Sequence, residues 1–230
     1  MKYFATLGAV CAIGLSVLGG QAQADIYHLT NTGTVSSGID TNGLFGDANA
    51  DLSGLEYSAV FTFDSSLLTP QNQSFPGIEI HGYHPGAGSV VLTIGGASYT
   101  YSGSDGSGFL RGTFAPGVNP MAAVSTAQIL GDSGYLTFQV ASLTTFLDPF
   151  NLASPLSYAV TDADRALPTT FASWDASDFR IVFNQETLLT SSDAGGPVTG
   201  VPEPATWALM ISGFGFAGTM LRRRRTLALA

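Results

Sequence analysis

Basic residues are scarce in this sequence and almost absent from its middle. Residues 25–200 contain no lysine and only three arginines, against 16 of the chain's 17 acidic residues. The formal charge of this region is therefore −13, whereas the whole chain of 230 residues carries −9. Nucleic-acid binding needs a basic surface, so this composition excludes a nucleic-acid partner.

Cysteine is nearly absent as well. The one cysteine, Cys11, lies in an N-terminal segment that we expect to be removed, and Val10 before it departs from the context of a lipoprotein site. The mature chain then has neither disulfides nor thiol chemistry. An exported protein of this kind must rely on its own hydrophobic core for stability.

The N-terminus predicts a secretory signal peptide over residues 1–24. Lys2 supplies the positive start, residues 4–18 form an apolar run, and Ala22 and Ala24 form an A-x-A cleavage site before Asp25. The alternative is a retained membrane anchor. The run is shorter than the ~20 residues that a span needs, so we favour cleavage.

The C-terminus carries a second hydrophobic segment. Residues 205–221 contain no charge and predict a single transmembrane helix roughly 26 Å long. The cluster that follows would stop the chain with that end in the cytoplasm; it consists of Arg222, Arg223, Arg224 and Arg225. Before the segment, Pro202 and Pro204 flank Glu203 and favour an extended backbone.

This three-part end, residues 201–230, resembles the PEP-CTERM protein-sorting signal. The resemblance rests on a set of matching positions: Pro202, Glu203, Pro204, Trp207, Gly213 to Gly215, Gly218 and Arg222 to Arg225. It implies recognition of the Pro-Glu-Pro motif by an exosortase, a membrane enzyme, with cleavage near that motif. It further implies a Gram-negative bacterium, a transient inner-membrane anchor with the ectodomain in the periplasm, and final location at the cell surface or outside the cell. The alternative is an ordinary tail anchor.

The middle of the chain predicts strands. Residues 55–63 alternate between apolar and polar positions, which is typical of a half-buried strand. Gly95-Gly96 predicts a hairpin turn between two further strands. We therefore expect residues 25–190 to form an all-β ectodomain, an antiparallel β-sandwich or jelly roll. Residues 120–130 carry a weak helix signal, and residues 191–200 read as a Gly/Ser/Pro linker.

Three side chains in the middle form a candidate metal site. Glu79 and His81 are two residues apart, so they share one face of a strand, and His84 follows after a glycine. Two histidines and a carboxylate can bind Zn²⁺. The Pro-Gly pairs on both sides of this run favour an exposed loop instead, so we expect no bound metal and no cofactor.

Other candidates are weaker. Ser133 lies in a Gly-Asp-Ser-Gly frame like that of serine proteases, but a hairpin turn explains these residues. The acidic pairs Asp162/Asp164 and Asp175/Asp178 lack a complete calcium loop. Exposed aromatics would be able to bind sugars, and three residues are candidates for this role: Tyr83, Phe150 and Trp174.

We therefore expect a non-enzymatic, exported structural protein of the cell surface or the extracellular matrix, processed by an exosortase. The first alternative is a carbohydrate-binding module of a biofilm or exopolysaccharide matrix. A second alternative is a hydrolase that uses His81 or His84.

Overall fold

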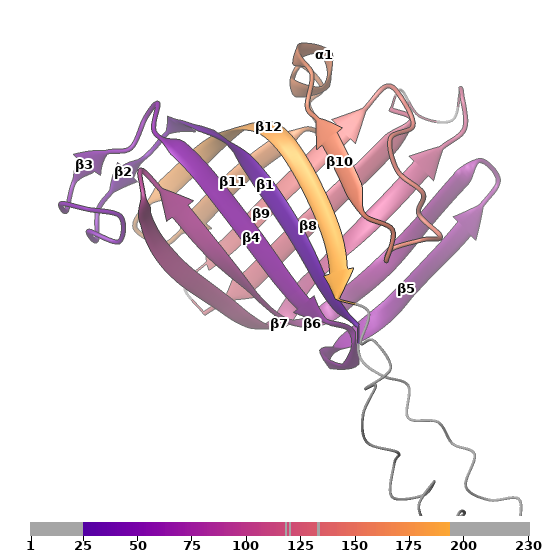
Figure 1. Ribbon diagram of the computed structural model, residues 1–230, viewed down its shortest axis with the longest axis horizontal. Helices are drawn as coiled ribbons and strands as arrows, with labels where there is room; N and C mark the ends of the chain where they lie inside the picture. The colour runs from indigo at the N-terminus through magenta and orange to yellow at the C-terminus, as the bar shows by residue number, and fades with distance from the viewer. Residues whose placement is uncertain (1–24, 118, 120, 133, 194–230) are drawn as a thin grey trace, which may run out of the picture. The chain divides into compact units, whose positions relative to one another are not determined.

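The computed structural model describes residues 25–193 except 118, 120 and 133, and these residues form a ten-stranded antiparallel sheet and a separate two-stranded one (Figure 1). Eight strands make up the main body of the larger sheet: β1 (Ile26–Ser37), β4 (Glu56–Asp64), β6 (Ile78–Ile94), β7 (Ala97–Phe114), β8 (Ala123–Gly131), β9 (Gly134–Ser142), β11 (Phe171–Ala176) and β12 (Arg180–Asp193). The remaining elements are β2 (Ile39–Asp40), β3 (Ala50–Asp51), the 3-10 helix η1 (Ser65–Leu67), β5 (Leu68–Phe75), β10 (Leu156–Ala159) and the α-helix α1 (Asp162–Arg165).

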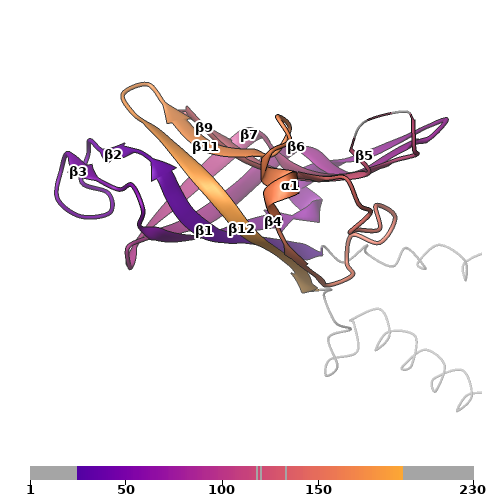
Figure 2. The ribbon, with the colours of Figure 1, turned by 90° about the horizontal axis from the view of Figure 1, so that it is seen from above.

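The main strands close into a barrel. Hydrogen-bonded neighbours follow the order β1-β4-β6-β7-β8-β9-β11-β12, and β12 pairs again with β1. β12 is bordered on its other side first by β11 and then by β10. Figure 2 shows β1 and β12 side by side on one wall, with β7, β9 and β11 on the opposite wall.

The expected all-β, antiparallel architecture is confirmed, but the sandwich or jelly roll is not, because the sheet is a closed eight-stranded barrel. The physical reason lies in the pairing of β1 with β12, which joins the edges that two separate sheets would leave open. Strand alternation is the same in a sandwich and in a barrel, so the local pattern does not distinguish them.

The barrel interior is filled by alternating side chains. In β4 the buried positions are Tyr57, Ala59, Phe61 and Phe63, as the alternation of this segment predicts. Phe138 of β9 reaches the rings of Tyr57 and Phe61, with centroids 5.7 Å and 5.4 Å away. Aromatic packing of this kind buries large apolar areas and supplies a core without disulfides.

The sequence correctly predicts one hairpin turn but assigns the wrong secondary structure to one later segment. Gly95 and Gly96 join β6 to β7, and both have a positive φ, at 58° and 92°, which is the conformation that a two-residue hairpin requires. The weak helix signal at residues 120–130 was wrong, because Ala123–Gly131 forms β8 with every second residue buried. β8 is hydrogen-bonded on one side to β7 and on the other to β9, and these pairings hold the segment in the extended conformation.

The first and last described residues lie together. Ile26 is paired with Asp193, and His28 Nε2 lies 3.3 Å from Asp193 Oδ2. Residues 191–193, which the sequence assigns to the linker, belong to β12. Within residues 25–193, with the gaps given above, no helix is long and apolar enough to cross a membrane, and the apolar segment 205–221 lies outside the described residues.

Candidate functional site

The residues expected to direct export lie outside the described residues. These are Ala22, Ala24, Pro202, Glu203, Pro204, Trp207 and Arg222 to Arg225. Their roles therefore stay predictions. The structure does show that the strands leading to the two signals, β1 and β12, are paired along most of their length.

The three candidate metal ligands do not converge. His81 Nε2 lies 3.4 Å from Glu79 Oε2, and His81 Nδ1 lies 2.9 Å from the side-chain oxygen of Asn72. His84 turns elsewhere and hydrogen-bonds the carbonyl oxygen of Gly106 at 3.1 Å. Among the residues that the structure describes, no group of three histidine, cysteine or acidic residues is placed to hold a metal ion.

The acidic pairs are engaged with neighbouring groups. Asp164 caps α1: its Oδ2 accepts hydrogen bonds from Tyr158 Oη and from both the backbone N–H and the hydroxyl of Thr161. Burial acts to raise the pKa of Asp164, but the hydrogen bonds from Tyr158 and Thr161 outweigh it and hold the pKa below its ordinary value. Asp162 is paired with Arg165 instead.

The second acidic pair is divided in the same way. Asp175 Oδ1 lies 2.9 Å from Arg180 Nε, and its Oδ2 accepts a hydrogen bond from the hydroxyl of Ser173. Asp178 Oδ2 accepts a hydrogen bond from Asn42 Nδ2. Each carboxylate has its own partner, so the two do not share one ligand.

The three candidate aromatic residues have different environments. Trp174 is 2% exposed and packs against Tyr99, with ring centroids 5.7 Å apart, so it belongs to the core. Tyr83 is half-buried beside Phe109. Phe150 is 68% exposed, and its ring lies 4.5 Å from that of His81. Of the three, Phe150 alone offers an open ring.

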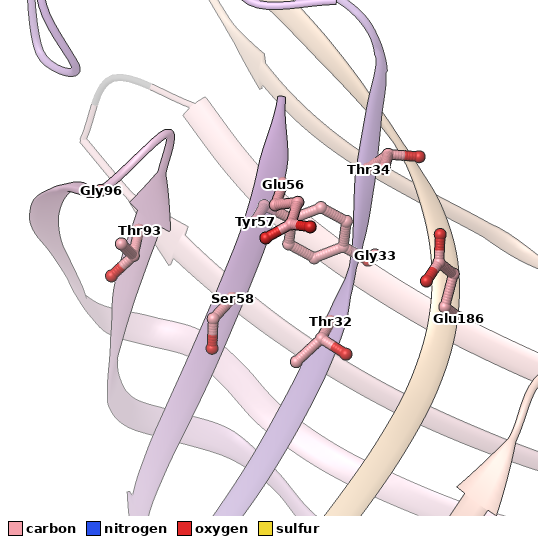
Figure 3. Close-up of a pocket in the computed structure, with 9 residues that line it drawn as sticks. All are labelled: Thr32, Gly33, Thr34, Glu56, Tyr57, Ser58, Thr93, Gly96 and Glu186. Atoms are coloured by element: carbon pink, nitrogen blue, oxygen red, sulfur yellow. The ribbon is translucent and has the colours of Figure 1, made fainter. Parts of the chain in front are cut away.

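An open groove lies on the outer face of β1, β4 and β12 (Figure 3). It has a volume of about 510 Å³, and Glu56 and Glu186 project from β4 and β12 on either side of Gly33. The ring of Tyr57 closes its floor behind Gly33, and burial, followed by the charge of Glu186, raises the pKa of the Tyr57 hydroxyl. Hydroxyl groups of threonine and serine complete the lining, so the groove offers acceptors and hydroxyls.

A smaller open cavity is lined by a buried cation that sequence reasoning had not singled out. It has a volume of about 330 Å³ and lies between β7 and residues 145–156. Arg111 of β7 lines it, although this side chain is only 2% exposed. The signal was present in the sequence: Arg111 follows Phe109 by two residues, so it occupies an inward-facing position of the strand.

The hydrogen bonds of Arg111 are incomplete. Nη2 donates to Thr190 Oγ1 at 2.6 Å, and Nη1 donates to the carbonyl oxygen of Asn151 at 3.3 Å. Nε has no hydrogen-bond partner. Burial lowers the pKa of the Arg111 guanidinium from its ordinary value, which reflects the cost of keeping the charge away from water.

A comparison with protein families identifies the C-terminal end. The PEP-CTERM protein-sorting motif matches residues 200–225. The chain carries a PEP-CTERM sorting signal. This signal indicates an exported protein that is targeted to an exosortase and anchored transiently in the membrane. Neither a curated protein nor a solved structure matches the chain.

Proposed function

We propose that this PEP-CTERM protein is a non-enzymatic structural component of the cell surface or the extracellular matrix of a Gram-negative bacterium. The observation that carries the proposal is the sorting motif at residues 200–225, placed after a closed barrel. The barrel would stay in the periplasm while the tail holds it at the inner membrane. Cleavage near Pro202-Glu203-Pro204 would then deliver it to the cell surface or the medium.

The closed barrel suits such a location. Closure pairs every strand of the ring on both sides, which removes most of the open sheet edges that promote aggregation. Residues 25–193 contain no cysteine, so the fold is independent of the redox state of its surroundings. A domain that needs neither disulfides nor an oxidant for folding is a good building block outside the cytoplasm.

The tether between the barrel and the motif is short. β12 ends at Asp193, and Pro202 follows nine positions later in the sequence. Nine residues reach at most about 30 Å when fully extended. Cleavage at the motif would thus leave the barrel with a short tail, and nearly all of the processed product would be barrel.

Mass spectrometry of surface-released protein tests this proposal. We expect the mature form to begin at Asp25 and to lack Arg222 to Arg225. Replacing Pro202, Glu203 and Pro204 together by alanine is expected to leave the uncut form in the membrane fraction. Pro197→Ala, which changes a proline outside the motif, is the matched control and should be processed normally. Released protein that still contains the arginine cluster would contradict the proposal.

Carbohydrate binding in a biofilm or exopolysaccharide matrix is the second candidate, and the outer groove favours it. Its volume of about 510 Å³ lies within the usual range for small-ligand sites, and its hydroxyl and carboxylate groups suit hydrogen bonding to sugars. The test is a pull-down with purified exopolysaccharide. Binding that is lost in a Glu56→Gln, Glu186→Gln double variant would support this function. Equal binding of the parent protein and the double variant to the polysaccharide would argue against it.

A further inference from the structure

Arg111 takes part in none of the ion pairs in the described part of the chain. Burial lowers the pKa of its guanidinium, and the negative charge of Asp148 nearby opposes this shift. Its two hydrogen-bond acceptors, the Thr190 hydroxyl and the Asn151 carbonyl, are both neutral. The described ion pairs join other residues: His28 to Asp193, His81 to Glu79, Arg165 to Asp162 and Arg180 to Asp175. Buried charges in proteins are normally paired, so an arginine that is 2% exposed and unpaired calls for an explanation.

The position of Arg111 does not follow from packing alone. An apolar residue at this inward-facing position would continue the row begun by Phe109 and avoid the cost of burying a charge. Arg111 instead lines a cavity, and its buried Nε makes no hydrogen bond. A guanidinium offers five donors in a planar fork that matches a carboxylate, and here only two donors are used.

The remainder of the cavity sets the size and the charge of what fits. Phe146 and Leu156 provide apolar walls, while Thr145 and Ser154 provide hydroxyl groups. Asp148 also lines it and is exposed, so a second negative charge on a ligand would be repelled there. At about 330 Å³ the cavity lies at the low end of the range for small-molecule sites.

We propose that this cavity binds a small organic monocarboxylate, with the carboxylate on the Arg111 guanidinium and the body of the ligand against Phe146 and Leu156. A compact hydroxylated acid, such as an acidic monosaccharide, has the matching chemistry. The bound carboxylate forms the close ion pair that the described residues do not provide, since the charge of Asp148 acts on Arg111 without forming one of the described ion pairs. The proposal is independent of the sorting signal, because it rests only on residues of the barrel.

Calorimetric titration of the full-length chain tests this inference. The probes are glucuronate, glucose as its neutral counterpart, and inorganic phosphate. We expect glucuronate to bind about tenfold or more tightly than glucose, because a charge-assisted hydrogen bond is lost with the carboxylate. Arg111→Met removes the charge but keeps an unbranched apolar side chain, and it should weaken glucuronate binding by about tenfold or more. Arg180→Met, at an exposed arginine, is the matched control and should bind like the parent protein.

A second variant keeps the test decisive if Arg111→Met does not fold. Asp148→Asn removes the competing negative charge and retains an oxygen that can accept the hydrogen bond from the Phe150 N–H. We expect it to bind glucuronate severalfold more tightly, and unchanged or weaker binding would count against the site. The inference is also overturned by equal binding of glucuronate and glucose, by tighter binding of phosphate, by full affinity in Arg111→Met, or by no glucuronate binding up to about 10 mM.

Discussion

Gly33→Ala is expected to destabilise the barrel at the pairing that closes it. Gly33 lies in β1, between Tyr57 of β4 and Gln185 of β12, next to an irregularity in the register of β1 and β12. A Cβ atom at this position would stand 2.0 Å from the backbone oxygen of Asn184 and 3.1 Å from the backbone nitrogen of Glu186. Both obstacles are backbone atoms of β12, so no side-chain rotation can make room.

The magnitude follows from this geometry. Because Cβ contacts shorter than 3.0 Å are essentially never found, β1 and β12 would have to separate locally by about 1 Å. Overpacking of this kind costs roughly 1–3 kcal/mol, and each ladder hydrogen bond that is stretched beyond its range adds about 0.5–1.5 kcal/mol. We expect a loss of about 3 kcal/mol in the free energy of unfolding. For a domain of this size that corresponds to a decrease in Tm of about 6–12 °C.

Thermal unfolding followed by circular dichroism measures the effect. Gly46→Ala is the matched control, since a Cβ at Gly46 meets nothing within 4 Å, and it should change the Tm by less than about 2 °C. A Gly33→Ala protein with the Tm of the Gly46→Ala protein would refute the argument that the backbone of β12 leaves no room for a Cβ atom at position 33.

Three further predictions concern the core and the loops. Asp40 is buried, and its carboxylate accepts hydrogen bonds from the backbone N–H groups of Leu44 and Phe45. Asp40→Ala should therefore lower the free energy of unfolding, measured with urea, by about 2–4 kcal/mol. Asp47→Ala, at an exposed aspartate, is the control and should leave this free energy almost unchanged. Because the pKa of Asp164 is lower in the folded state, its carboxylate stabilises the fold at pH values above its unfolded-state pKa near 4, and this contribution is lost as the pH falls through the folded-state pKa. Asp164→Asn should therefore make the decline of Tm below about pH 4 less steep. An unchanged decline would contradict the role of the hydrogen bonds to Asp164. Trp174→Ala should lower the free energy of unfolding, measured with urea, by about 3–5 kcal/mol, because Trp174 fills the core. A variant as stable as the parent protein would contradict the burial of Trp174.

Much of the strand pattern was predictable from local sequence. The alternation at residues 55–63 correctly predicts which side chains of β4 are buried, and Gly95-Gly96 correctly predicts the hairpin between β6 and β7. Alternation has this power because successive side chains of a strand point to opposite faces. Residues 120–130 were misread because β8 gains its pairing partners from β7 and β9, and its own composition does not specify them.

The candidate sites were less predictable. Glu79 and His81 lie together as their spacing predicts, but His84 turns to the Gly106 carbonyl, which lies on another strand. The spacing of Arg111 from Phe109 predicts that its side chain faces inward, but the sequence does not predict that Arg111 takes part in none of the described ion pairs. That property depends on where Thr190 and Asn151 lie, and both are far from Arg111 in the sequence.

The sequence by itself determined that the chain carries a sorting signal for export and that segments such as residues 55–63 form strands, because sorting signals and strand periodicity are properties of neighbouring residues. Tertiary structure decided that the sheet closes, since closure depends on contacts such as that between His28 and Asp193, 165 residues apart. It also decided that Arg111 is a buried cation at the edge of a cavity. Burial and charge pairing are set by every element that packs around a residue, and local sequence does not carry that information.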